Sequence, residues 1–84
     1  MSSTDAIARV TLFSAHGCHL CERARSVLAK TGVPFDEVDI TGELELEARY
    51  REWLPVVEID GERAFVYYVD EAALRRKLSA QSQA

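Results

Sequence analysis

Residues 10–32 read VTLFSAHGCHLCERARSVLAKTG and join a short apolar run to a helical pattern through a Cys-x-x-Cys motif. The run Val10–Phe13 is β-branched and apolar, which is typical of a buried strand, and Ala15–Gly17 has the composition of a turn. Beyond the turn, apolar residues recur at helical spacing until Gly32 interrupts them. These patterns predict a strand, a turn and a helix that begins at or beside Cys18.

A second strand and a second helix are predicted next. Pro34 opens a strand that ends near Ile40, and Thr41 is a candidate N-cap for the helix that follows. Acidic residues in the first turn support this start, because their negative charges interact favourably with the positive end of the helix dipole. Pro55 ends the helix. Its apolar face is formed by Leu46, Tyr50, Trp53 and Leu54.

The remaining residues predict a hairpin and a third helix. Asp60-Gly61 accepts the positive φ angles of a type I′ turn and separates the apolar runs 56–59 and 63–68. Asp70 can then cap a helix whose buried stripe continues to Leu78. In the order β-α-β-α-β-β-α, the crossover makes one pair of strands parallel and the hairpin makes another antiparallel. We therefore predict an α/β fold with a mixed four-stranded sheet flanked by helices.

Length and composition define the class of protein. The 84 residues suffice for a single domain, predicted over 1–84 with a core at about 9–78 and a frayed tail at 79–84. The 48% hydrophobic and 29% charged content is that of an ordinary globular protein. No apolar run approaches the ~20 residues of a membrane span, and Met1–Ala8 lacks the features of a secretory signal. We expect a cytoplasmic protein with no membrane partner.

The charge distribution argues against one class of partner. The net charge of −4 disfavours a general nucleic-acid binder, so no nucleic-acid partner is expected. Residues 34–62 hold ten acidic side chains against only Arg49 and Arg51, whereas residues 1–33 are net basic. Both cysteines lie in this basic segment, which modestly favours a thiolate there.

The motif Cys18-His19-Leu20-Cys21 is the strongest functional signal. Unpaired N–H groups and the positive dipole end at a helix N-terminus lower the pKa of a cysteine from about 8.5 toward ~3.5–7.5. Thiolate is the attacking species in disulfide exchange, and the second cysteine lies one helical turn away. We therefore predict Cys18 as the nucleophile and Cys21 as the resolving thiol. His19 could favour the thiolate when protonated, or could face solvent.

Other interpretations of the motif are weaker. A structural disulfide here would close a very short loop and stabilise the fold by only about 2 kcal/mol, whereas a disulfide that closes a fifteen-residue loop contributes ~3 kcal/mol. A zinc site within one chain would need His16, Cys18, His19 and Cys21, and ligands so crowded fit a tetrahedral site poorly. Glu22 stands where c-type haem attachment requires a histidine. A pair of idle cysteines remains an alternative.

These features together resemble the thioredoxin superfamily, and within it the small glutaredoxin-like proteins. The resemblance covers about residues 9–78 and rests on the strand leading into Cys18–Cys21, the segment Leu54–Val57, the Asp60-Gly61 hairpin and the closing helix. It implies a thioredoxin-like fold and thiol–disulfide oxidoreductase activity. It also implies that Pro55 is cis beside the active sulfurs and that the backbone of Leu54 pairs with an extended substrate. The candidate substrate-binding residues are therefore Leu54, Pro55 and His19.

The chain departs from the glutaredoxins that use glutathione. Those proteins carry a basic residue three positions before the nucleophile and a tyrosine before the second cysteine, where this chain has Ala15 and Leu20. Their Gly-Gly pair before an acidic residue is replaced by Tyr68-Val69 before Asp70. A helix that starts with acidic residues is a poor receptor for a glutathione carboxylate. The sequence therefore leaves glutathione dependence open.

Four further residues have two interpretations each. Trp53, Tyr67 and Tyr68 could form an aromatic wall beside a substrate, but their places in a helical stripe and in a strand favour core or half-buried positions. His16 could act as a base near Cys18, although a solvated turn histidine is favoured.

We expect an enzyme that exchanges a dithiol for a disulfide on a disulfide-containing protein or a low-molecular-weight thiol substrate, with a separate reductant. This cycle needs no metal and no organic cofactor, and the chain is expected to act as a monomer. Two alternatives come from other classes. One is a metal or iron–sulfur module in which Cys18 and Cys21 of two chains share a centre, and the other is a thioredoxin fold kept as a non-catalytic binding domain.

Overall fold

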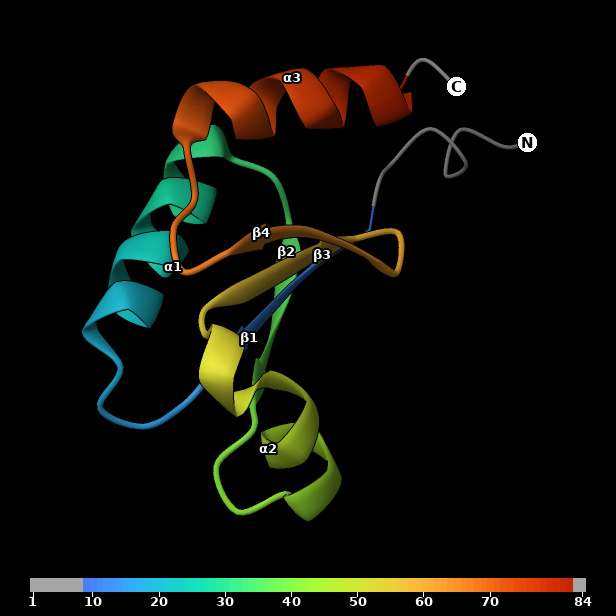
Figure 1. The fold of residues 1–84 in the computed structure, drawn as a ribbon. Helices are drawn as coiled ribbons and strands as arrows, with labels where there is room; N and C mark the ends of the chain where they lie inside the picture. Colours follow the sequence, from blue (N-terminus) through green and yellow to red (C-terminus); the bar gives the residue numbers. More distant parts are fainter. Residues whose placement is uncertain (1–8, 83–84) are drawn as a thin grey trace.

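The computed structural model describes residues 9–82, and its elements follow the predicted order (Figure 1). They are strand β1 (Val10–Ser14), helix α1 (His19–Thr31), strand β2 (Phe35–Asp39), helix α2 (Leu44–Tyr50), the short 3-10 helix η2 (Arg51–Trp53), strands β3 (Val56–Ile59) and β4 (Glu62–Val66), and helix α3 (Glu71–Ser82). Within 9–82, none of the helices is long and apolar enough to cross a membrane.

The strands form one mixed sheet in the order β2-β1-β3-β4, which confirms the predicted thioredoxin-like α/β fold. β1 pairs in parallel with β2, as expected for strands joined by a crossover helix, and antiparallel with β3. The turn between β3 and β4 has φ angles of 55° at Asp60 and 84° at Gly61, which fit the predicted type I′ turn. β1 therefore lies inside the sheet and leads directly into the cysteine motif.

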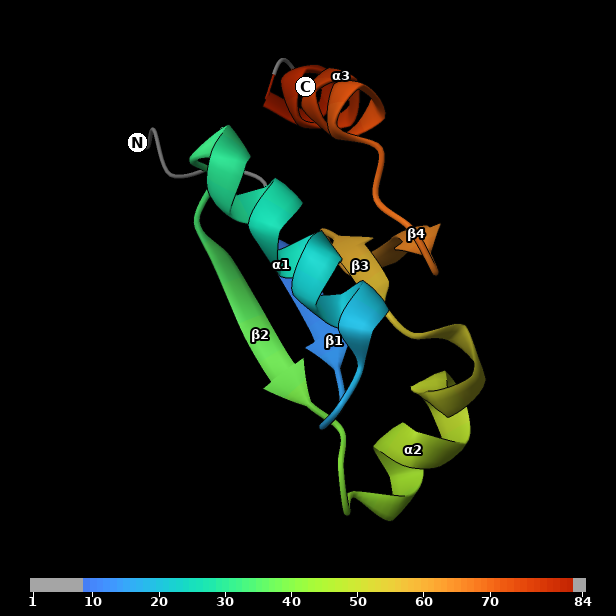
Figure 2. The same ribbon diagram turned by 90° about the vertical axis from the view of Figure 1, so that its left-hand side faces the viewer.

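The fold buries two separate hydrophobic clusters, one that includes residues of α1 and α3 and one that includes Tyr50 of α2. Figure 2 shows α1 lying across one face of the sheet. Because alternate residues of a strand point to opposite faces, Leu12 and Phe13 belong to different clusters. The buried members of the first are Val10, Leu12, Ala24, Leu28, Val57, Ile59, Val69 and Leu74. Those of the second are Phe13, Ala15, Ile40, Tyr50 and Val56.

Helix α1 begins and ends at the residues that the sequence indicated. Cys18 is its N-cap, with an extended backbone, and Gly32 is its C-cap, with a φ of 76°. This left-handed angle favours glycine, and the Gly32 N–H donates to the Ala29 carbonyl at 3.1 Å. Leu28 is fully buried against the sheet. The helix is therefore anchored to the core beyond the motif that its first turn carries.

The prediction that Thr41 caps the second helix is wrong. Glu43 is the N-cap of α2 and makes no side-chain capping bond. Thr41 instead ties the cysteine turn to the end of β2, because its Oγ1 accepts from the His16 N–H at 3.0 Å. Its own N–H donates to Asp39 Oδ1 at 2.9 Å. The hydroxyl is therefore engaged in a long-range contact that replaces local capping.

Core positions are wrong for the three aromatic residues that had two interpretations. α2 ends at Tyr50 and continues as η2, so Trp53 leaves the buried stripe and is 39% exposed. β4 ends at Val66, and Tyr67 and Tyr68 beyond it are 46% and 71% exposed. Each residue lies outside the regular element in which the sequence pattern placed it.

Helix α3 is drawn as far as Ser82, within the predicted tail 79–84, and residues 83–84 lie outside the described part. No Gly or Pro follows Leu78 to stop the helix. At its start, Asp70 Oδ1 accepts from the Ala72 N–H at 3.1 Å, which confirms the predicted cap.

Candidate active site

The cysteine motif lies where β1 meets α1, and a disulfide joins Cys18 to Cys21. Their Cα atoms are 5.2 Å apart, which is within the usual range for a disulfide. The Cys21 N–H donates to Cys18 Sγ at 3.1 Å, so this sulfur takes the acceptor position that a side-chain oxygen normally occupies at a helix N-cap. In the reduced state, the same N–H and the helix dipole favour a Cys18 thiolate.

The two sulfur-bearing residues differ in exposure. Cys21 is 1% exposed, whereas Cys18 is partly exposed. An incoming disulfide therefore reaches Cys18 more easily than Cys21. The difference is consistent with the predicted roles of attacking and resolving sulfur.

A polar hollow of about 440 Å³ opens on one side of Cys18. Arg25 forms a two-pronged ion pair with Glu37 in this hollow, and Ser14 Oγ donates to Glu37 Oε2 at 2.8 Å. The Arg25 guanidinium is the largest cause that holds the pKa of Glu37 below its usual value, and the Ser14 hydroxyl lowers it further. Glu37 is therefore ionised at neutral pH.

His16 borders the same hollow, with its Nδ1 3.4 Å from Asp39 Oδ2. Hydrogen bonds from Thr41 are the main cause that holds the pKa of Asp39 below its usual value, and His16 contributes less. The imidazole is 87% exposed. It is therefore the solvated turn histidine that the sequence favoured.

The Leu54–Pro55 peptide bond is cis, as the resemblance implies. Leu54 is half-buried and has an extended backbone, with φ of −62° and ψ of 145°. The Pro55 carbonyl accepts from the Tyr67 N–H at 2.9 Å, and Tyr67 lines a groove together with Leu20 of the cysteine motif. These contacts connect the Leu54–Pro55 segment to the neighbourhood of the cysteines.

His19 lies in the first turn of α1 and is exposed. Among residues 9–82, no group of three or more His, Cys, Asp and Glu side chains is placed to hold a metal ion. The described part of one chain therefore does not gather His16 and His19 with the two cysteines into a metal site.

The ion pair beside Cys18 was not predicted from the sequence. Arg25 and Glu37 are 12 positions apart, and Ser14 and Glu37 are 23 apart, so no local pattern links them. The parallel pairing of β1 with β2 was the available signal. It sets Ser14 opposite Asp39, and Glu37, two residues earlier in β2, points to the same face of the sheet as Asp39. Sequence reasoning alone did not take that step.

Comparison with known proteins agrees with this geometry. Residues 9–79 match the model of the glutaredoxin-like domain family (DUF836). The X-ray structure of protein XcR50 from X. campestris is 32% identical, over 84% of this chain and 96% of that one, with a TM-score of 0.76. No curated protein matches the chain.

Two more distant structures share the fold. Protein Ne2328 from Nitrosomonas europaea is 19% identical over 84% of this chain and 91% of that one, with a TM-score of 0.72. The holo form of glutaredoxin C1 from populus tremula x tremuloides is 23% identical over 96% of this chain and 82% of that one, with a TM-score of 0.66. The fold and the Cys18–Cys21 pair support a redox-type role, and the chain belongs to the glutaredoxin-like domain (DUF836) family.

Proposed function

We propose that the protein is a thiol–disulfide oxidoreductase acting on a disulfide-containing protein or a low-molecular-weight thiol substrate. The position of Cys18 carries this proposal. Its sulfur sits at the N-cap of α1, accepts from the Cys21 N–H and is partly exposed, while Cys21 is buried one turn further on. This arrangement favours a surface thiolate with a second sulfur within bonding reach.

The exchange proceeds in two displacements. The Cys18 thiolate attacks one sulfur of the substrate disulfide, forms a mixed disulfide with it, and displaces the other substrate sulfur as a thiolate that takes a proton from water. Cys21 loses its proton to water, and its thiolate then attacks Cys18 Sγ and displaces the second substrate thiolate. The substrate gains two electrons and the cysteine pair loses two. A separate thiol reductant restores the dithiol.

Leu54, Pro55 and His19 are proposed to contact the substrate. Leu54, beside the buried Pro55, has the extended backbone that can add a strand of substrate through main-chain hydrogen bonds. His19 is exposed within the motif itself.

The cycle requires a compartment that keeps thiols reduced, and we propose the cytoplasm.

A Cys21→Ser variant tests the proposal by trapping. This variant keeps the attacking sulfur and loses the resolving one, so Cys18 should remain joined to a disulfide-containing peptide as a mixed disulfide that reducing agents release. The matched control is Cys18→Ser, which should trap nothing. If Cys18→Ser traps the peptide and Cys21→Ser does not, the two roles are reversed.

Equilibrium measurements separate the proposal from its alternatives. We expect a reduction potential between about −270 and −180 mV, the range of thioredoxin, glutaredoxins and disulfide isomerase. A cysteine pair that never forms the intramolecular disulfide would support a non-catalytic binding domain. A stoichiometric metal that survives dialysis of the reduced protein would support the metal or iron–sulfur module.

A further inference from the structure

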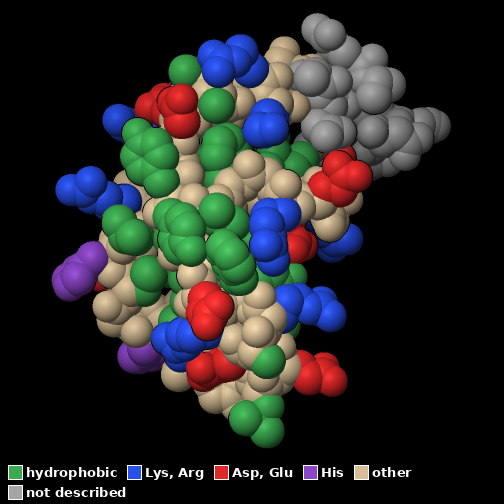
Figure 3. Space-filling model, viewed as in Figure 1, with side chains coloured by type: hydrophobic (Ala, Val, Ile, Leu, Met, Phe, Trp, Pro, Cys, Tyr) green, Lys and Arg blue, Asp and Glu red, His purple; other side chains and the backbone are tan. Residues whose placement is uncertain are grey.

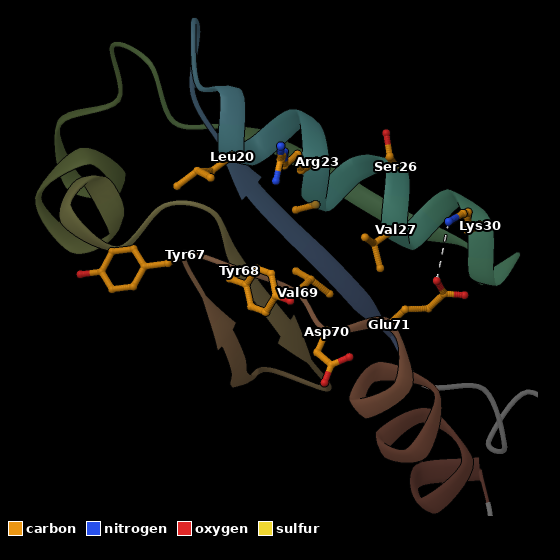
Figure 4. Close-up of a pocket in the computed structure, with 11 residues that line it drawn as sticks. Leu20, Arg23, Ser26, Val27, Lys30, Tyr67, Tyr68, Val69, Asp70 and Glu71 are labelled. Carbon is orange, nitrogen blue, oxygen red and sulfur yellow. Dashed lines mark ion pairs between the residues drawn. The ribbon is translucent and has the colours of Figure 1, made fainter.

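An apolar groove runs along α1 (Figure 4), and its lining shares no residue with that of the polar hollow. One wall belongs to α1, and the other to the segment 67–70 that joins β4 to α3 and to Glu71 at the start of α3. Its volume is about 530 Å³, which lies within the range of ligand pockets. Ala24 and Val69 form its buried floor. Leu20 lies at one end, so the groove begins inside the cysteine motif.

Large apolar side chains border this groove at the surface. Leu20, Tyr67 and Tyr68 are 47%, 46% and 71% exposed. Figure 3 shows hydrophobic side chains gathered across this face of the molecule, with charged side chains around them. Single exposed apolar residues are ordinary, but a cluster of them around a groove and rimmed by charges is typical of an interaction site.

The backbone at Tyr67 shows that this wall is held in place. Tyr67 has a φ of 67°, a value that L residues with bulky side chains rarely adopt. Its N–H contacts the carbonyls of Pro55 at 2.9 Å and Trp53 at 3.3 Å, and the Tyr68 N–H donates to the Val66 carbonyl at 2.7 Å. Strained conformations persist where the surrounding structure enforces them, and they cluster at functional sites.

The charges along the groove differ between its two ends. At the far end Glu71 forms ion pairs with Lys30, with 3.9 Å between Nζ and Oε1, and with Arg75, with 2.9 Å between Oε2 and Nη2, so its negative charge is neutralised. Asp70 there accepts from a backbone N–H and adds negative charge. Near the cysteines, the Arg23 side chain has no ion-pair or hydrogen-bond partner within residues 9–82. In the described part of the chain, Arg23 thus offers the groove an unpaired cation one helical turn from Leu20.

We infer that this groove binds a protein substrate through an apolar side chain next to the reactive cysteine, with an acidic side chain facing Arg23. The inference rests on the proposed exchange function and names its substrate class. The apolar side chain packs among Leu20, Tyr67 and Tyr68 while the substrate sulfur is joined to Cys18. Glutathione lacks an apolar side chain that could pack there.

The test is a single-turnover assay in which pre-reduced protein is the only reductant. Disulfide-bonded peptides of one framework carry Leu and Glu, Ser and Glu, or Leu and Lys beside one cysteine, and oxidised glutathione is compared with them. Reactions are quenched by acid, alkylated and analysed by mass spectrometry. We expect the Leu–Glu peptide to react about tenfold faster than the Ser–Glu peptide. The Leu–Lys peptide should react roughly threefold more slowly than the Leu–Glu peptide.

Two surface variants assign these preferences to the groove. Tyr68→Ser should slow the Leu–Glu peptide toward the rate of the Ser–Glu peptide and should slow the Ser–Glu peptide far less. Arg23→Glu should reverse the choice between Glu and Lys. Arg76→Glu is the matched control, because it makes the same charge change on an exposed residue of α3 outside the groove. It should leave the order of the peptides unchanged.

The remaining outcomes overturn the inference in distinguishable ways. Equal rates for all peptides, or oxidised glutathione as the fastest substrate, overturn it and leave the exchange function in place. A Tyr68→Ser variant that dissociates a dimer without altering any peptide rate shows that a second copy of the chain covers the groove. If neither the peptides nor oxidised glutathione is reduced, the proposed function fails as well.

Discussion

Truncating Leu28 should remove a large part of the stability of this domain. Leu28 is 0% exposed and lies on α1 within the cluster that joins α1, α3 and the sheet. Leu→Ala changes at comparable buried sites cost about 3–5 kcal/mol, because transfer free energy is lost and a cavity remains. An 84-residue domain is stable by ~4–13 kcal/mol. We therefore expect Leu28→Ala to lower the free energy of unfolding by about 3–4 kcal/mol.

Leu44→Ala is a matched control, because it makes the same chemical change at a side chain that is 87% exposed. It should change the free energy of unfolding by no more than about 0.5 kcal/mol. Urea unfolding followed by far-UV circular dichroism measures both. The melting temperature should fall by roughly 12–30 °C for Leu28→Ala, at ~4–8 °C per kcal/mol in a domain of this size.

The reasoning fails if Leu28→Ala costs less than about 1 kcal/mol, or if Leu44→Ala costs as much as Leu28→Ala. Should Leu28→Ala not fold, Leu28→Val provides the measurement, since it removes one methylene and should cost about 1 kcal/mol. Both variants keep the cysteine motif. At temperatures where they are folded, the reduction potential of the Cys18–Cys21 pair should equal that of the unaltered protein.

Three further predictions concern the site and its helix. In the reduced protein, iodoacetamide should alkylate the partly exposed Cys18 before Cys21, which is 1% exposed, and peptide mapping that finds Cys21 modified first would contradict the assignment. The pKa of Glu37 is lowered in the folded state, mainly by Arg25. Its contribution to the free energy of unfolding is therefore complete above the unfolded pKa near 4.5 and is lost as the pH falls through the folded pKa. Between pH 7 and pH 3, the urea midpoint of Glu37→Gln should therefore decrease less than that of the unaltered protein. Equal decreases in the two proteins would refute this. Gly32→Ala should lower the free energy of unfolding in urea by about 1 kcal/mol, because a φ of 76° is strained for alanine. The added Cβ itself has room, since no atom other than its chain neighbours lies within 4 Å. An unchanged stability would show that the helix end relaxes.

Local chemistry explains why much of the fold could be predicted. The strand leading to Cys18, the stop at Gly32 and the Asp60-Gly61 turn each depend on residues close together in sequence. The N-cap position of Cys18 follows from such a local boundary, so this position could be predicted from neighbouring residues alone. The same reasoning failed for Thr41, because its hydroxyl is taken by the His16 N–H in a contact across 25 positions.

The surroundings of the cysteines depend on contacts that sequence spacing does not encode. The Arg25–Glu37 pair forms because β1 and β2 pair in parallel, and the exposure of Trp53 follows from the turn that η2 makes after α2. Tyr67 adopts its positive φ where the carbonyl of Pro55 binds its N–H, although its strand pattern favoured an extended backbone.

The candidate cysteine pair thus came from the amino-acid sequence, since a Cys-x-x-Cys motif at a predicted helix start indicated it. The polar hollow beside Cys18 and the apolar groove that begins at Leu20 came from the folded chain. Both are built from segments distant in sequence, which only the packing of the sheet, α1 and the segment before α3 brings together.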